Sequence, residues 1–206
     1  MARVVNIHPD SPQQRLLVQA ADFIRNGAVV ALPTDSCYAL GCHLGDREAL
    51  DRIRQIRQID ERHHLTLMVR DLSEIAHFAR VDNSQYRLLK AATPGSYTFI
   101  LEGTKELPRR LLHPKRKTIG LRIPNHPVAL ALLEELNEPL LTTTLQLPGD
   151  DRRGRRQAHA RYPGAHRAVL APADPGRPSR RLPEAVGVGD VGPSVERIEA
   201  TAPVDG

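Results

Sequence analysis

Aromatic residues, cysteines and long apolar runs are all scarce in this chain of 206 residues. Aromatics make up 3% and there is no Trp, so any core must be built from Leu, Ile, Val and Ala. The only two cysteines, Cys37 and Cys42, form no CxxC pair, which excludes a disulfide framework and disfavours a zinc site. No apolar run could span a bilayer and no secretion signal is evident. We therefore expect a cytoplasmic protein without a membrane partner.

Two common catalytic signatures are absent as well. The sequence has no GxxxxGK followed by Ser or Thr, so ATP would not bind through a P-loop. It also has no GxSxG, the nucleophile elbow of the α/β-hydrolases. Cys37 would act as a thiol nucleophile only if a distant base reached it, and a small buried residue is the alternative interpretation.

Strand-like and helix-like segments alternate along the first 150 residues. Apolar residues recur at helical spacing after Ser11-Pro12, Asp46, Asp71 and Asn83, and again from 126 to 137. Apolar runs typical of strands occupy 28–32, 65–69, 97–102, 118–123 and 140–145. The alternation predicts an α/β fold, an open twisted sheet flanked by helices. The neighbouring strands near 97–123 favour a mixed sheet over a purely parallel one.

The composition changes abruptly near residue 150. From 151 to 206 the chain carries arginine doublets and scattered prolines, and its only apolar patch is a weak one at Val169-Leu170. Such a segment cannot bury enough surface to offset its ordering entropy, so we expect a domain at 5–150 followed by a disordered tail at 151–206. Two origins of the tail stay open: a shifted reading frame in GC-rich DNA, or a genuine basic tail for RNA.

Residues 33–42, PTDSCYALGC, form the most informative segment of the chain. Pro33 cannot donate to a strand ladder, so the apolar run at 28–32 should end there. The small hydroxylated residues that follow suit a strand end that opens into a ligand crevice. An ordinary strand-to-turn junction is the alternative.

Three further segments follow in order, namely TPGSYTFIL at 93–101, TIGLRIPNHP at 118–127 and EPLLTTTLQ at 138–146. Together with residues 33–42 they resemble the YrdC/YciO family over about residues 5–150. The YciO branch is closest, through IHPD at 7–10, RDLSE at 70–74 and PRRLL at 108–112. The resemblance implies the YrdC-like fold, from which the family's C-terminal strands would be missing here. It also implies the family's founding activity, the synthesis of threonylcarbamoyl-AMP for tRNA modification.

The resemblance implies ATP, threonine and bicarbonate as substrates, with Mg²⁺ on the triphosphate and no metal bound by the protein itself. Thr34 would then hydrogen-bond the threonine or carbamoyl oxygen, because a hydroxyl is both donor and acceptor. The alternative for Thr34 is a local ST-turn. His64 and Thr142 would also contact the substrate. A solvated loop histidine and an ordinary strand residue are the respective alternatives.

The catalytic positions of the family are altered in this chain. Its Lys-x-Arg becomes Arg57 and Ile59, so one cation beside the triphosphate is lost, and Arg62 is a displaced candidate to replace it. Its Ser-x-Asn becomes Thr144 and Gln146, which keep a hydroxyl and an amide. Arg57 and Thr144 are the predicted catalytic residues, and both would bind nucleotide together with Gln146. Losing one positioned charge typically costs about 100- to 1000-fold in rate.

A basic run extends over 105–122, and the net charge of +5 with a pI near 9.6 favours anionic partners. Arg122 lies within the predicted strand and is our candidate for a nucleotide phosphate. The other cations would contact an RNA backbone, namely Arg109, Arg110, Lys115, Arg116 and Lys117. The scarcity of aromatics disfavours single-strand recognition by stacking, so double-stranded RNA or tRNA fits better. A solvated charged face is the alternative.

Two functions of different class follow from these residues. The first is a threonylcarbamoyl-AMP synthase-type nucleotidyltransferase with an altered catalytic centre. The second is a nucleotide- and double-stranded-RNA-binding module with weak or no synthase activity. Thr34 and Arg122 suit both functions, whereas Ile59 and Gln146 favour the second. Diphosphate release that depends on both threonine and bicarbonate would discriminate between them.

Overall fold

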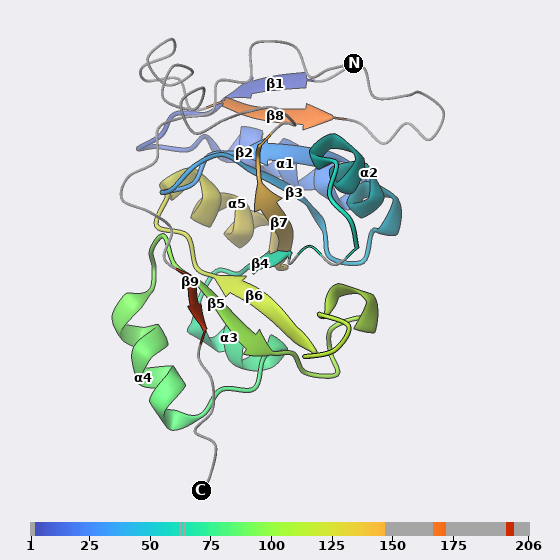
Figure 1. Ribbon diagram of the computed structural model, residues 1–206. Helices are drawn as coiled ribbons and strands as arrows, with labels where there is room; N and C mark the ends of the chain where they lie inside the picture. The colour runs from blue at the N-terminus through green and yellow to red at the C-terminus, as the bar shows by residue number, and fades with distance from the viewer. Residues whose placement is uncertain (1–2, 62, 64, 147–166, 172–196, 200–206) are drawn as a thin grey trace, which may run out of the picture.

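The computed structural model describes residues 3–61, 63, 65–146, 167–171 and 197–199, which form one sheet flanked by helices (Figure 1). The helices are α1 (Gln14–Arg25), α2 (Arg47–Arg57), α3 (Leu72–Phe78), α4 (Asn83–Ala92), the short 3₁₀ helix η1 (Arg109–Leu111) and α5 (Pro127–Leu136). The strands are β1 (Arg3–Asn6), β2 (Val29–Leu32), β3 (Ala39–His43), β4 (Thr66–Met68), β5 (Thr98–Glu102), β6 (Thr118–Arg122), β7 (Leu140–Thr144), β8 (Arg167–Ala171) and β9 (Arg197–Glu199).

The strands pair in the order β1-β8-β2-β3-β7-β4-β6-β5-β9. The sheet is mixed, because β4 runs parallel to β6 and β5 runs parallel to β9, while the other neighbours are antiparallel. The strands near 97–123, which favoured a mixed sheet, are β5 and β6, and they pair antiparallel. The predicted fold class, an α/β mixed sheet with helices, is therefore confirmed.

Alternate residues of the strands β2, β3, β4 and β7 supply two separate apolar cores. Val29 and Ala31 of β2 belong to one core, whereas Val30 and Leu32 belong to the other. Because successive side chains of a strand point to opposite faces, the two cores lie on opposite sides of the sheet. Helices α1 and α5 pack together in the second core, while α2, α3 and α4 contribute to the first.

Side-chain caps fix where several helices begin. Asp46 accepts a hydrogen bond from the backbone N–H of Ala49 at 2.9 Å, and Asp71 caps α3 in the same way, as predicted. The cap of α4 is Asp82, one residue before the predicted Asn83. None of the helices among the described residues is both long and apolar enough to cross a membrane.

The first helix also starts later than predicted. It begins at Gln14 and not at Ser11-Pro12, because the segment before it is held as a loop by two side-chain bonds. His8 donates its backbone N–H to Gln13 Oε1 at 3.1 Å, and Nδ1 of His8 accepts the backbone N–H of Ser11 at 3.2 Å.

Two short segments within 151–206 are described, and both are strands, while the expected disordered tail and the expected loss of the family's C-terminal strands stay predictions. β8 inserts between β1 and β2, with Val169 opposite Val4 and Leu170 opposite Val30. β9 pairs with β5 at the other edge of the sheet. Backbone donors and acceptors of a sheet edge pair with almost any extended segment, so local composition under-predicts such strands. The rest of the predicted tail lies outside the described residues.

Candidate functional site

The loop between β2 and β3 is folded as a tight hydroxyl-centred turn. The backbone N–H of Thr34 donates to the carbonyl of Cys37 at 3.2 Å, and Oγ1 of Thr34 donates to the same carbonyl at 2.5 Å. In return, the backbone N–H groups of Ser36 and Cys37 both donate to Thr34 Oγ1 at 3.3 Å. These contacts form the local ST-turn that was the alternative interpretation of Thr34. A substrate contact by Thr34 stays a prediction.

Arg122, at the end of β6, fastens this loop. Its Nη2 lies 2.5 Å from Oδ1 of Asp35, and its Nη1 donates to Oγ of Ser36 at 2.8 Å. The two charged side chains are only 9% and 14% exposed. Nε of Arg122 is buried and has no hydrogen-bond partner among the described residues. The guanidinium is therefore engaged in positioning the loop, and its predicted contact with a nucleotide phosphate stays a prediction.

The Pro94-Gly95 turn adjoins the same strand end. The backbone N–H of Gly95 donates to the carbonyl of Ile123 at 2.9 Å. A Cβ at Gly95 would lie 3.0 Å from the carbonyl oxygen of Ala92, which leaves little room for a larger residue. The structure thus brings three of the four motif segments together around Arg122.

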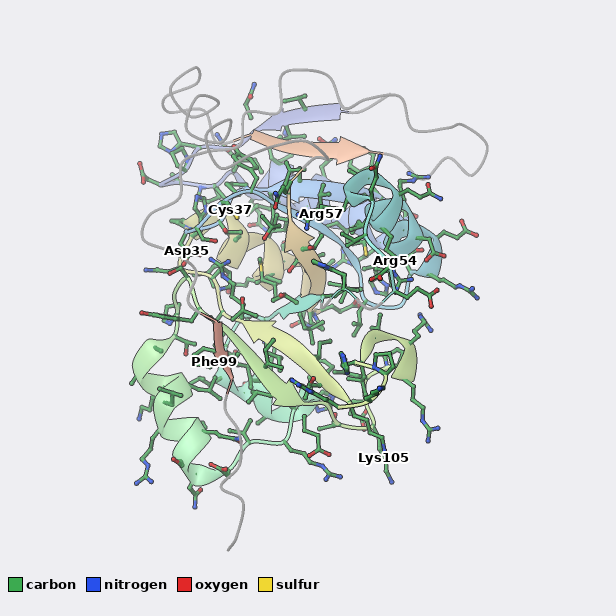
Figure 2. The ribbon with its side chains drawn as sticks, in the orientation of Figure 1. Asp35, Cys37, Arg54, Arg57, Phe99 and Lys105 are labelled. Atoms are coloured by element: carbon green, nitrogen blue, oxygen red, sulfur yellow. The ribbon has the colours of Figure 1, made fainter. Side chains whose placement is uncertain are left out.

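Arg57 contacts Thr144 at the C-terminal end of β7. Arg57 ends α2, and its Nη1 donates to the backbone carbonyl of Thr144 at 2.5 Å. Thr144 pairs with Ala39 in the sheet, and the backbone N–H of Leu145 donates to the carbonyl of Tyr38 at 2.8 Å. The predicted catalytic pair therefore lies beside Tyr38 and Ala39, which directly follow the turn that contains Thr34. Figure 2 labels Arg57 and, in that turn, Asp35 and Cys37. Gln146 comes directly after Leu145 and is half-buried.

Thr142 is held inside the sheet. It is 2% exposed, and its Oγ1 donates to the backbone carbonyl of Thr66 on β4 at 2.9 Å. This geometry favours the alternative interpretation, an ordinary strand residue, over the predicted substrate contact. A substrate group that accepts a hydrogen bond from Oγ1 would have to displace that interstrand bond, and the predicted substrate contact stays a prediction.

The predicted substrate residue His64 and the candidate cation Arg62 lie outside the described residues. Their neighbour His63 is described, and its pKa is lowered by partial burial and by the positive charge of Arg57, against the opposing charge of Asp60. His63 therefore lies close enough to Arg57 to respond to its charge. The sequence analysis named His64 and did not connect its neighbour His63 with Arg57.

The cations predicted to bind RNA lie on the segment between β5 and β6. All five are exposed, namely Arg109, Arg110, Lys115, Arg116 and Lys117. His113 organises part of this segment, because its Nδ1 accepts the backbone N–H groups of Lys115 and Arg116 at 3.3 and 3.1 Å. The segment precedes β6, whereas Arg122 ends that strand. The predicted RNA cations and Arg122 therefore belong to different ends of β6.

Asp35 and Ser36 are the residues that the sequence analysis missed. Both stand beside the predicted Thr34, but nothing in the local pattern showed that they bind a side chain 86 or 87 positions later in the chain. In the part of the chain that the structure describes, no group of three or more His, Cys, Asp or Glu side chains is arranged to hold a metal ion.

The model of one protein family, Sua5/YciO/YrdC, with the description "Telomere recombination", matches residues 22–175. The chain belongs to this family. YciO of Escherichia coli K12, described as uncharacterized, is 57% identical over 151 residues, 73% of each chain. The crystal structure of E. coli YciO superposes with a TM-score of 0.68 at 52% identity and covers 78% of this chain and 79% of its own.

More distant members of the Sua5/YciO/YrdC family carry functional names. A protein of Chromobacterium violaceum named threonylcarbamoyl-AMP synthase is 32% identical over 142 residues, which are 68% of this chain and 73% of its own. Sua5 of P. abyssi, crystallised with L-threonine, has a TM-score of 0.63 at 26% identity. It covers 68% of this chain and 41% of its own. The resemblance to the family and to its YciO branch is confirmed.

Proposed function

We propose that this chain is a threonylcarbamoyl-AMP synthase-type nucleotidyltransferase with a weakened catalytic centre. The reaction joins ATP, threonine and bicarbonate into threonylcarbamoyl-AMP and releases diphosphate and water. The observation that carries the proposal is the meeting of Arg57 with Thr144 beside the turn of Thr34. Three segments that are remote in sequence thus converge at one end of the sheet. The name of the C. violaceum relative, threonylcarbamoyl-AMP synthase, supports the same assignment.

The proposed chemistry needs little beyond positioning and charge. The amino group of threonine adds to bicarbonate with loss of water, which gives N-carboxythreonine. An oxygen of its carbamate group attacks the α-phosphorus of ATP, the bond from that phosphorus to the bridging oxygen breaks, and diphosphate leaves with that electron pair. Arg57 would stabilise the charge that develops on the phosphoryl oxygens, with Thr144 and Gln146 beside it. Mg²⁺ would arrive as part of the ATP substrate. Thr34 and His64 would contact threonine in this proposal.

Two features of the site explain why we propose weak catalysis. Ile59 stands where active family members place a second cation, and its side chain cannot stabilise charge. In addition, one guanidinium nitrogen of Arg57 already donates to the Thr144 carbonyl. When a phosphate binds, either this hydrogen bond breaks or the other nitrogens of the guanidinium donate to the phosphate.

Diphosphate release from ATP tests the proposal. The full chain should release diphosphate only when both threonine and bicarbonate are present. Arg57→Gln should lower the rate about 100-fold, because it removes the charge beside the phosphates. Arg87→Gln is the matched control, since Arg87 is exposed on α4 and should leave the rate unchanged. Release that needs no threonine, or that survives Arg57→Gln, would contradict the assignment.

Restoring the altered positions gives a second test. Ile59→Arg combined with Gln146→Asn should raise turnover more than ATP affinity, because the added charge acts on the transition state. The single changes should do less than the pair, since groups that act as a unit are non-additive. If the double variant binds ATP as the parent does and shows no gain in rate, the site serves binding only.

The binding-module alternative, with double-stranded RNA or tRNA as partner, is favoured by the exposed cations before β6. If they contact an RNA backbone, affinity for a duplex of about 16 bp should fall steeply with salt. Lys115→Gln with Lys117→Gln should flatten the slope of log affinity against log salt by roughly 1 to 2. An unchanged slope would identify these lysines as a solvated face. In either function, a cytoplasmic location is part of our proposal.

A further inference from the structure

The last turn of α2 is closed by a residue in an unusual backbone conformation. Among the described residues other than glycine, a positive φ is found at Gln58, Lys117 and Asn137. Gln58 comes directly after Arg57 and has φ 51° and ψ 44°. Glycine adopts this left-handed conformation without cost and Asn tolerates it, whereas other residues are strained there. A strained residue next to a predicted catalytic one indicates that its conformation is used.

Two backbone hydrogen bonds hold Gln58 and Ile59 against the end of the helix, and we call this arrangement the α2 closure. The N–H of Gln58 donates to the carbonyl of Gln55 at 3.3 Å, and the N–H of Ile59 donates to the carbonyl of Arg54 at 3.1 Å. The second bond spans five residues, which is the pattern of a Schellman motif. The Gln58 side chain is exposed and has no hydrogen bond with a described residue. The closure therefore uses the backbone of Gln58 and not its amide.

The α2 closure turns the chain back directly after Arg57. Arg57 ends the helix, and its Nη1 donates to the carbonyl of Thr144 on β7. Beyond the closure the chain returns to Arg57. The pKa of His63 is lowered most by partial burial and further by the charge of Arg57, so the two side chains are close. A right-handed residue at position 58 would instead lengthen α2 and carry His63 away from Arg57.

We propose that Gln58 is a positioning residue whose left-handed backbone holds the Arg57 side chain beside Thr144 at the end of β7. Gln58 acts through Arg57 and does not touch the substrate. The proposal rests on the proposed function for its effect on rate, whereas the effect on the position of Arg57 is independent of any reaction. It also gives Ile59 a role through its backbone N–H, apart from the charge that its side chain lacks.

A proton NMR titration of His63 in the full chain reports the position of Arg57 without any substrate. The ring resonance of His63 is assigned as the one that His63→Gln lacks. Gln58→Val should raise the pKa of His63, because a β-branched residue rarely adopts a positive φ and the charge of Arg57 would move away. Gln58→Gly should leave this pKa unchanged, since glycine keeps the left-handed conformation.

A double-mutant cycle separates Arg57 from the other charges near His63. Asp60 opposes the effect of Arg57 on the pKa of His63 and follows the closure directly. The other charged or titratable side chains that line the same surface hollow as His63, among the described residues, are Arg54, Glu61, Arg110 and His113. In the background of Arg57→Gln, Gln58→Val should no longer raise the pKa of His63. An equal rise in both backgrounds would show that a charge other than Arg57 had moved, and would overturn the proposal.

Diphosphate release measures the consequence for the reaction, at a temperature where every variant is folded. Gln58→Val should lower kcat about 10- to 100-fold, because a catalytic group displaced by about 1 Å loses that much rate. Gln58→Gly should keep the rate of the parent. Asn137→Val is the matched control, since Asn137 closes α5 with φ 51° and precedes β7 at the end remote from Thr144. It should lower the melting temperature and leave both the rate and the pKa of His63 unchanged.

Melting curves keep folding and positioning apart. Gln58→Gly should raise the melting temperature by about 2–4 °C, because it removes the strain. If Gln58→Val does not melt cooperatively, Gln58→Thr replaces it as the second β-branched variant, with the same expected results. An unchanged pKa of His63 in the folded β-branched variant would overturn the proposal. If the parent released no diphosphate, the proposed function would fail, while a rise in the pKa of His63 that depends on Arg57 would still establish that Gln58 positions Arg57.

Discussion

The ion pair between Arg122 and Asp35 should dominate the stability of the candidate site. The two side chains are 9% and 14% exposed, so removing one partner leaves the other as an unpaired charge with little access to water. Asp35→Ala should lower the free energy of unfolding by about 3–5 kcal/mol, because it leaves the buried guanidinium with Ser36 as its one hydrogen-bond partner among the described residues. Arg122→Met should cost less, about 1–3 kcal/mol, since Asp35 lies on a loop and can turn toward solvent.

A double-mutant cycle measures the pair itself. The double variant, Asp35→Ala with Arg122→Met, should cost at least about 2 kcal/mol less than the sum of the single variants. The assay is urea denaturation followed by circular dichroism, with linear extrapolation to water. The control cycle uses the exposed pair Arg80–Glu102, whose side chains are 70% and 53% exposed and should couple by at most about 1 kcal/mol. Additivity within about 0.5 kcal/mol at Arg122 and Asp35 would refute the reasoning.

Three further predictions concern other parts of the chain. Gly41→Ala should lower the free energy of unfolding by about 1–3 kcal/mol in the same urea assay, because its Cβ would lie 2.6 Å from Cδ2 of Leu140. The pKa of Asp71 is lowered chiefly by the hydroxyl that donates to it. Its contribution of about 1 kcal/mol should thus persist above pH 4 and vanish as the pH falls through the lowered pKa, so that unfolding curves of Asp71→Ala and the parent converge in acid. Burial raises the pKa of Cys42 to about 12, so an aromatic disulfide reagent at pH 8 should titrate the half-buried Cys37 alone until urea is added.

Patterns within a few residues predicted most helices and the apolar strands. They did not predict strands that lack a local apolar pattern or that pair with a segment far along the chain. The caps at Asp46 and Asp71 were predictable because each acts within one turn. β3 was missed because its residues, Ala39–His43, include Gly41 and Cys42 and stand inside a motif that suggested a crevice. β1 was missed because its hydrogen-bonding partner, β8, begins at residue 167. The local spacing of apolar residues does not show which distant segment a strand pairs with.

The same distinction applies to the candidate site. The resemblance to the family indicated Arg57 and Thr144 as catalytic residues, and the two residues do meet. The turn around Thr34 was one of the stated alternatives because its bonds join residues two or three apart. By contrast, the contact of Thr142 with Thr66 spans 76 positions, and that of Arg122 with Asp35 spans 87. The sequence therefore indicated where polar side chains come together. It did not indicate which of them already form hydrogen bonds within the protein.

The two arginines of the candidate site should consequently differ in how readily they meet a ligand. Arg57 donates to a neutral carbonyl, and a typical hydrogen bond of that kind contributes about 0.5–1.5 kcal/mol net. A phosphate that takes over this donor replaces a neutral acceptor by a charged one, so the exchange is favourable. Arg122 is bound to a carboxylate in a buried pair, and a phosphate gains little there because it would leave Asp35 without its cation. We therefore expect a phosphate to bind Arg57, whereas Arg122 holds the loop of Asp35 and Ser36 in place.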